Sequence, residues 1–365
     1  MESANPFIIE LKEIILPADN IELDQYVLKH PDCSVYHLSA WRNAIAAAYH
    51  HRQLILVAKV GSTVVGYLPL CLVETPLLGK KLISLPFADF CGALADSTEI
   101  VLQLLAAATG LLDRFQAKSL QIRTRLLDQN LTDASPVDAS QSAQVKVRMC
   151  VPLAQDSTAL LKSYKPKLRS QIKKAEKNGL SAHWRTDFAA LELFYQIYCK
   201  NMHRLGSPVH RFAWFEALWR ELSPHDAIYL SVVSLDDQPV AAGLVIIVNQ
   251  QACIPWASTL AEFNHLAPNM LMYWEIQAKL ADRGVQLFDM GRSTAGEGTF
   301  RFKAQWGAEP EALCWFSYAS AQDEPLLMTN QSTGLLRNLA EKVWPQLPLL
   351  LATKLGARLR KYITL

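Results

Sequence analysis

The chain carries the same order of predicted elements twice. In the first half, a β-rich hairpin, a helix and a strand are predicted at residues 54–73, 98–117 and 119–124. In the second half, a hairpin, a strand, a helix and a strand are predicted at residues 228–248, 252–258, 269–282 and 285–290. This repeated order favours a duplicated α/β (α+β) domain, each copy with a mixed sheet flanked by helices. A chance agreement between two unrelated α/β halves is the alternative.

A glycine occupies the same place in the second strand of each hairpin. It follows two small or β-branched residues, as Gly66 in VVG and as Gly243 in AAG. A glycine inside a strand indicates a bulge or a close approach of another part of the chain. We therefore expect both glycines to lie against a packed neighbour.

The length of 365 residues suits two domains, since one core rarely grows this large. A stretch at 126–144 is rich in polar residues and is expected to be a surface connection, with the boundary near Val151. The predicted organisation is a first domain at 1–150, a second at 151–330 and a tail at 331–365. The tail alternates apolar and basic residues and is expected to form an amphipathic helix that packs on the first domain. A peripheral contact with an anionic membrane is the alternative for this tail.

The charge and composition of the chain exclude several classes of protein. The chain has 36 basic and 34 acidic residues, and half of its residues are apolar. These values exclude a disordered chain and one that coats nucleic acid over its whole surface. The longest apolar run, at 241–248, is far shorter than the roughly 20 residues of a membrane span. Seven cysteines without a CxxC pair indicate a reduced protein without a metal site, and we expect it in the cytoplasm or at the inner face of the membrane.

The densest charge lies at residues 162–177. Seven cations face a single anion, Glu176, in this stretch. Pro166 is placed to start a helix, and Leu168, Ile172 and Ala175 repeat at helical spacing. A solvated helix face is the ordinary interpretation of such a charge run. A ligand that carries phosphate is the alternative, because the rest of the chain is balanced in charge.

Residues 285–310 combine a strand end, a glycine-rich loop and a short aromatic and basic run. The strand ends at 289–290, and residues 299–304 are expected to be extended again. In an extended run, Phe302 shares one face with Phe300, and Lys303 shares the other with Arg301. By composition alone, Lys303 is a surface lysine beside Trp306.

Five motifs carry a resemblance to a known family. They are FDMGRS at 288–293, GTFRFKAQWGAEP at 298–310, YKPKLR at 164–169, MHRLGSP at 202–208 and NMLMYWE at 269–275. Together they resemble FemAB-like proteins, and more particularly the branch found with exosortase (PEP-CTERM) and exopolysaccharide systems. The resemblance covers most of residues 160–318, whereas the first 150 residues agree only in outline.

The resemblance implies two tandem GNAT-like acyltransferase domains and a transferase activity. It implies transfer of an acyl or aminoacyl group to an amino or hydroxyl group of a polysaccharide or cell-envelope precursor. Lys303 and Phe302 match the Phe-Lys pair at the family's reaction centre, where a fixed cation stabilises the tetrahedral oxyanion. Asp289 is the nearest candidate base. Further substrate contacts are expected from residues of the same blocks and of the facing strand: Arg292, Arg169, Lys173, Arg204, Asn269, Tyr273 and Trp256.

The donor is unresolved between aminoacyl-tRNA and acyl-CoA, and no tightly bound cofactor is expected. Acetyltransferases that use CoA seat its pyrophosphate on a glycine-rich turn at a helix N-terminus. The residues before Asn269 contain no glycine, which weakens CoA as the donor. The expected partners are a sugar- or lipid-linked envelope precursor and the acceptor end of an aminoacyl-tRNA. The alternatives are a non-catalytic scaffold protein of an exopolysaccharide assembly and a CoA-dependent N-acetyltransferase.

Overall fold

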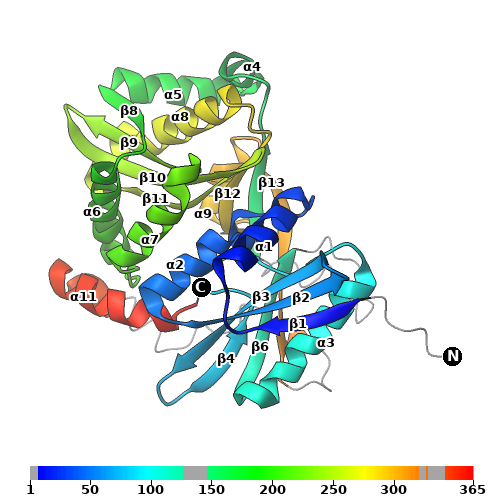
Figure 1. Cartoon of the computed structure of the whole chain (residues 1–365). Helices are drawn as coiled ribbons and strands as arrows, with labels where there is room; N and C mark the ends of the chain where they lie inside the picture. The colour runs from blue at the N-terminus through cyan, green and yellow to red at the C-terminus, as the bar shows by residue number, and fades with distance from the viewer. Residues whose placement is uncertain (1–6, 126–145, 320–325, 328–341, 365) are drawn as a thin grey trace. The chain divides into compact units, whose positions relative to one another are not determined.

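The computed structural model describes residues 7–125, 146–319, 326–327 and 342–364, which belong to two units (Figure 1). Unit 1 comprises residues 1–147, 311–330 and 364–365, and unit 2 comprises residues 148–310 and 331–363. The predicted connection at 126–144 and the first part of the tail lie outside the described residues. Within the described part of the chain, no helix is both long and apolar enough to cross a bilayer.

Unit 1 is a mixed sheet with helices packed on it. Its elements are β1 (Ile8–Lys12), α1 (Pro17–Lys29), α2 (Ser39–Tyr49), β2 (Arg52–Val60), β3 (Thr63–Thr75), β4 (Gly79–Ile83), β5 (Leu94–Ala95), α3 (Thr98–Phe115), β6 (Ala117–Arg125), β13 (Glu309–Tyr318) and β14 (Leu326–Leu327). The strand order is β1-β2-β3-β4-β6-β13. The β4–β6 pair is parallel, and the other neighbouring pairs are antiparallel.

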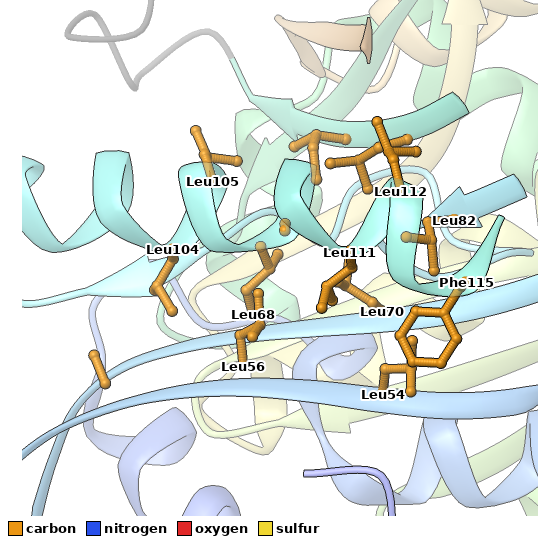
Figure 2. Packing of buried hydrophobic residues seen from close by; sticks show 14 of the residues in the cluster. Leu54, Leu56, Leu68, Leu70, Leu82, Leu104, Leu105, Leu111, Leu112 and Phe115 are labelled. Atoms are coloured by element: carbon orange, nitrogen blue, oxygen red, sulfur yellow. The ribbon is translucent and has the colours of Figure 1, made fainter. Parts of the chain in front are cut away.

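The core of unit 1 lies between α3 and the sheet. The α3 side chains Leu104, Leu111 and Phe115 face Leu54 and Leu68 on β2 and β3, as Figure 2 shows. The helix begins after Ser97, whose hydroxyl accepts a hydrogen bond from Ile100 N at 3.4 Å. Apolar residues at helical spacing thus cover alternating apolar residues of the strands.

Unit 2 has the same plan. Its elements are β7 (Lys146–Pro152), α4 (Ser157–Ser163), α5 (Pro166–Lys177), β8 (Leu180–Arg185), α6 (Phe188–Arg204), α7 (Phe212–Leu222), β9 (Ile228–Leu235), β10 (Gln238–Val248), β11 (Gln251–Thr259), α8 (Pro268–Asp282), β12 (Leu287–Thr294), α9 (Gly298–Ala304) and α11 (Leu349–Leu359). The strand order is β8-β9-β10-β11-β12-β7. Consecutive residues of β10 are buried, so both faces of this sheet are covered, and α6 and α8 are the helices that pack on β10.

The shared plan confirms the predicted mixed α/β fold with two related halves. The run β1-α1-α2-β2-β3-β4-α3-β6 in unit 1 corresponds to β8-α6-α7-β9-β10-β11-α8-β12 in unit 2. In each unit a sixth strand completes the sheet beside the strand that follows the long helix. That strand is β13 in unit 1 and β7 in unit 2.

The sixth strands are exchanged between the halves, which corrects the predicted domain ranges. Strand β7 follows β6 in the chain but lies beside β12, and β13 follows unit 2 in the chain but pairs with β6. Residues 311–330 therefore belong to unit 1 and not to the predicted second domain at 151–330. Local hydrophobic patterning shows that a segment is a strand, but not which sheet edge it will join.

The tail is also placed differently from the expectation that it packs on the first domain. Helix α11 packs against α6 of unit 2, and the two helices lie side by side in Figure 1. His203 Nε2 lies 2.8 Å from Leu347 O, and Arg360 Nε donates to His210 Nε2 at 3.0 Å. A Cβ on Gly356 would lie 2.8 Å from Val209 N, so a glycine is required at this contact. The sequence pattern predicted the helix, but this backbone contact decided its location.

The two matched glycines lie in close contacts, as predicted. A Cβ on Gly66 would lie 2.5 Å from Ile100 Cγ2 of α3. A Cβ on Gly243 would lie 2.9 Å from Ile254 Cδ1 and 3.4 Å from Met272 Sδ of α8. Each glycine thus lets the central strand approach the long helix of its own unit. The equivalence of these contacts is further support for duplication.

We expect Gly66→Ala to lower the free energy of unfolding by about 1–3 kcal/mol, because the new methyl group overpacks the contact with Ile100. Gly110→Ala is the matched control. Gly110 lies on α3, and a Cβ there has no heavy atom within 4 Å. The control should raise stability by about 0.5–1 kcal/mol through helix propensity. Urea unfolding measures both changes, and equal effects of the two substitutions would contradict the close contact at Gly66.

Candidate functional site

Strands β11 and β12 separate in the middle of unit 2. They pair in parallel at three positions, from Gln251 opposite Leu287 to Cys253 opposite Asp289. Strand β11 then continues along β10 to Thr259, and β12 continues to Thr294. Gly291 adopts a φ of +77°, and a Cβ there would lie 3.6 Å from Ile254 O. The two strands therefore separate at a kink in β12 that favours glycine. Beyond this kink, the backbone groups of β12 can bind partners other than β11.

Residues 298–304 form helix α9, so the predicted extended conformation of 299–304 is wrong. The sheet neighbours of β12 are β11 and β7, and the chain turns away from β12 through Gly296 at a φ of +77°. In a helix, Phe302 and Trp306 lie one turn apart and pack together, with ring centroids 6.4 Å apart. Lys303 then projects at about 100° from Phe302 around the helix rather than on the opposite face.

Lys303 is buried, which overturns its interpretation as a surface lysine. Its exposed fraction is 8%, and its Nζ donates to Gly291 O and to Arg292 O, both at 2.9 Å. A buried ammonium group requires such hydrogen-bond acceptors. The two carbonyls belong to β12 just after it has left β11. The resulting arrangement is a fixed positive charge at the point where the strands separate.

Asp289 lies before the kink at Gly291 and binds the backbone of the same segment of β12. Its Oδ1 accepts a hydrogen bond from Gly291 N at 2.7 Å, and its Oδ2 lies 3.6 Å from Arg148 Nη1. Both charged side chains are almost fully buried. Asp289 thus positions the Gly291 backbone, whose carbonyl binds Lys303. Arg148, on β7, was not among the predicted residues, because a single arginine in an apolar strand gives no motif.

Four aromatic rings support α9. Trp306 is 1% exposed, and its ring centroid lies 5.6 Å from Tyr164 and 6.2 Å from Tyr273. Tyr273 in turn meets Phe302 at 5.3 Å. Burial raises the pKa of Tyr273, so its phenol stays neutral at physiological pH. The structure thus brings Phe302, Tyr273 and Lys303 together, and Trp306 is part of the core.

A second polar group lies at the end of β11. Arg204 Nη2 donates to Asn201 Oδ1 at 3.0 Å, and Asn201 Nδ2 donates to Ser258 Oγ at 3.3 Å. The next residue, Thr259, donates through its hydroxyl to Asn269 Oδ1 at the start of α8. Arg204 and Asn269 are therefore both connected to the end of β11. Ser258 was expected to line the substrate site, whereas Asn201 and Thr259 were missed, although polar residues that close an apolar strand are a usable signal.

Arg169 and Lys173 lie on α5, and Trp256 lies elsewhere in unit 2. Trp256 packs on Phe215 at 5.0 Å and on His210 at 5.7 Å. Burial holds the pKa of His210 well below its usual range, which suits a neutral structural imidazole. Its predicted role in substrate binding remains a prediction.

Helix α5 is strongly basic and adjoins the site at both ends. At its start, Tyr164 packs on Trp306, and at its end Asn178 Nδ2 donates to Leu266 O at 3.1 Å, just before α8. Its buried side consists of Leu168, Ile172 and Ala175, as the spacing predicted. Seven cations lie on α5 or in the residues just before it, and they make no ion pair with any residue in the described part of the chain. They are Lys162, Lys165, Lys167, Arg169, Lys173, Lys174 and Lys177.

The start of α8 offers few groups to a pyrophosphate. Ala267, at a φ of +63°, precedes the helix, and Pro268 is its first residue. Proline has no N–H, and Met270 N already donates to Ala267 O at 2.9 Å. A glycine-rich cradle of free amides is therefore not formed here. The end of α5, a strongly basic helix, lies beside the residue before this turn, through Asn178 Nδ2 and Leu266 O.

The equivalent place in unit 1 is occupied by the chain itself. Beyond the β4–β6 pair, Ser84 N donates to Gln121 O at 2.9 Å, and Cys91 N donates to Arg123 O at 2.9 Å. Arg123 is fully buried and donates to Ala88 O and Thr364 O at 2.9 and 2.8 Å. Of the described residues, those of unit 2 therefore form the candidate site.

Comparisons with known proteins match part of unit 2 to a domain family and both units to solved structures. Residues 162–304 match the family model of the acetyltransferase (GNAT) domain, and this range lies within unit 2. The crystal structure of FemX is similar over 83% of this chain and 95% of its own, with a TM-score of 0.64 and 16% identity. No curated protein matches the sequence.

Two further solved structures are similar over both units. A tandem GNAT protein from the clavulanic acid biosynthesis pathway covers 87% of this chain and 100% of its own, with a TM-score of 0.54 and 15% identity. L-PGS from Bacillus licheniformis covers 92% of this chain and 99% of its own, with a TM-score of 0.54 and 11% identity. Residues 162–304 thus match the acetyltransferase (GNAT) domain, and the fold of the chain is similar to that of FemX and of a tandem GNAT protein. The exosortase and exopolysaccharide branch stays a prediction.

Proposed function

We propose that this chain is an acyl- or aminoacyltransferase whose reaction centre lies around Lys303 in unit 2. The acceptor is an amino or hydroxyl group of a polysaccharide or cell-envelope precursor. The observation that carries the proposal is the buried Lys303 ammonium, fixed by two carbonyls of β12 where that strand leaves β11. The matched GNAT domain, which ends at residue 304, supports the reaction class.

The proposed step is nucleophilic acyl transfer. The acceptor nitrogen or oxygen attacks the carbonyl carbon of an ester or thioester donor, and the carbonyl oxygen becomes an oxyanion. The C–N or C–O bond to the acceptor is kept, the bond to the leaving alcohol or thiol breaks, and the acceptor's proton passes to the leaving group. Lys303 stabilises the oxyanion electrostatically, because its charge is held in place before the reaction begins.

Asp289 has a positioning role in this proposal. Its carboxylate is engaged by Gly291 N and lies beside Arg148, and both interactions favour the charged form that holds the kink. Its role as the general base stays a prediction. The leaving group can itself receive the proton, so the step does not require a protein base.

The donor is aminoacyl-tRNA or acyl-CoA, and α5 is the proposed contact for its phosphates or for those of the acceptor. We expect Lys173→Ala/Lys174→Ala to weaken binding of the phosphate-bearing substrate about tenfold or more, and to reduce the salt dependence of binding. The measurement is a substrate titration at several salt concentrations. The matched control is Arg220→Ala/Lys279→Ala, which removes two exposed cations of unit 2 outside α5. Equal affinity of the α5 variant and the wild type would identify α5 as a solvated face.

A ligand panel separates the two donor classes. A ligand present at about 100 times its dissociation constant stabilises the folded state by about 2.7 kcal/mol. Because α8 lacks an amide cradle, we expect a larger thermal shift from an aminoacyl-tRNA mimic than from acyl-CoA. A larger shift with acyl-CoA would favour the alternative of a CoA-dependent N-acetyltransferase.

A further inference from the structure

The C-terminal segment 342–363 exposes apolar and basic side chains together. It contains five cations and no acidic residue. Its exposed large apolar side chains are Val343, Leu350, Leu351, Leu359 and Ile363. Leu350 is 77% exposed, and its neighbour Leu351 is 45% exposed, so α11 begins with two adjacent exposed leucines.

Helix α11 packs on unit 2 through a narrow side of small residues. Ala352 and Gly356 are its buried residues, and they lie against the residues that follow α6. At about 100° per residue, Leu350, Leu351, Lys354 and Arg358 share the opposite side, within roughly a third of the helix circumference. The outward side therefore begins with two leucines and continues with two cations one turn apart.

The outward cations are available to a partner. Lys354 and Arg358 are exposed and make no ion pair with any residue in the described ranges. The neighbouring Arg360 is bound to His210 and anchors the end of the helix to unit 2. The helix is thus held by its inner side and by its C-terminal end, while its outer side is left uncovered.

We propose that the outward side of α11 binds the surface of an anionic phospholipid bilayer. An interfacial helix places its leucines at the boundary between headgroups and acyl chains, and its basic side chains bind the lipid phosphates. The absence of acidic residues from 342 to 363 complements a negative surface. This proposal is independent of the acyltransfer reaction and of its substrate.

The leucines distinguish this surface from one that binds nucleic acid. Phosphate backbones are bound by basic and polar side chains, and apolar leucines at the exposed start of a helix add nothing to such a contact. Helix α5 shows the contrasting pattern, since its exposed side is basic without an exposed large apolar residue. The two helices therefore present different chemistry to their surroundings.

Vesicle sedimentation of the full chain tests the proposal. The protein should bind vesicles of phosphatidylglycerol mixed with phosphatidylcholine, and should bind pure phosphatidylcholine vesicles weakly. Lys354→Ala/Arg358→Ala should lower the partition coefficient about thirtyfold, because each cation contributes about fivefold near an anionic surface. Leu350→Ser/Leu351→Ser should lower it about tenfold or more and should leave its salt dependence unchanged.

The matched control is Arg220→Ala/Lys279→Ala, which removes the same charge from exposed positions on α7 and α8 of unit 2. It should leave vesicle binding within about twofold of wild type. Equal losses from the control and the α11 variant would show non-specific charge attraction and overturn the proposal. So would full binding by the leucine variant, or concentration-dependent self-association that the leucine variant abolishes while vesicles have no effect. Circular dichroism checks that each exposed substitution leaves the fold intact.

Discussion

Lys303→Met should lower kcat for acyl transfer by about 10²–10³ and leave the protein folded. Methionine keeps the length and most of the volume of the lysine side chain, but it removes the charge that would stabilise the oxyanion. The Gly291 and Arg292 carbonyls lose this donor, which should lower the free energy of unfolding by about 1–3 kcal/mol for each carbonyl that stays unsatisfied. Turnover of the folded variant is measured with the donor that the ligand panel identifies, and urea unfolding gives the loss of stability separately.

Arg301→Met is the matched control for this prediction. Arg301 lies on the same short helix and is exposed, whereas Lys303 is 8% exposed. The same chemical change at Arg301 should alter kcat by less than about threefold, since an exposed charge is screened by solvent. Lys303→Arg retains the charge and should keep more activity than Lys303→Met.

The same variant separates the enzyme from the scaffold alternative. A scaffold protein would support polysaccharide assembly without the ammonium, so Lys303→Met at equal abundance would complement a deletion strain. A transferase that depends on Lys303 would not complement the deletion strain when it carries this substitution. Full complementation, or wild-type turnover of Lys303→Met, would contradict the proposed reaction centre.

Trp306→Ala should lower the free energy of unfolding of the protein by about 3–5 kcal/mol. Its ring is buried between Tyr164, Tyr273 and Phe302, which come from the turn between α4 and α5, from α8 and from α9. Truncation would leave a cavity at the junction of these elements, and the surrounding rings can fill it only in part. Urea unfolding followed by circular dichroism measures the change.

Trp306→Phe is the control that keeps an aromatic ring. Trp306 Nε1 has no hydrogen-bond partner among the described residues, so its removal sacrifices no hydrogen bond. This substitution should cost less than about half of the alanine value, because a smaller volume is lost. An alanine variant as stable as the phenylalanine variant would show that the ring does not support α9.

Several features of the fold follow from local patterning. The two hairpins, the helices α3 and α8 and the basic helix with its narrow apolar stripe were predicted, because side-chain periodicity directly reports which face of an element is buried. The matched glycines predicted close contacts for the same reason, since a missing side chain inside a strand marks limited space. The motifs around Lys303 also led to the residue on which the proposed reaction depends.

Part of the site could not be predicted from local sequence patterns. The run at 298–304 alternates like a strand, yet it is a helix, because Phe302 and Trp306 find partners in Tyr164 and Tyr273 from distant parts of the chain. Arg148 and Asn201 lie far in sequence from the residues they contact. Their contributions depend on neighbours that only the folded chain supplies.

The sequence by itself determined the type and order of the repeated hairpin, helix and strand elements and the basic helix, it favoured a duplication, and it pointed to Lys303 as the charged residue of the site. The tertiary structure decided that β7 and β13 exchange between the halves, that the tail packs on unit 2 and that Lys303 is buried. The physical reason is the range of the forces involved. Periodicity and capping act over a few residues, whereas a sheet edge, a docking face and the partners of a buried ammonium depend on groups brought together by folding. Lys303 and the Arg292 carbonyl are 11 residues apart, and Arg360 and His210 are 150 residues apart.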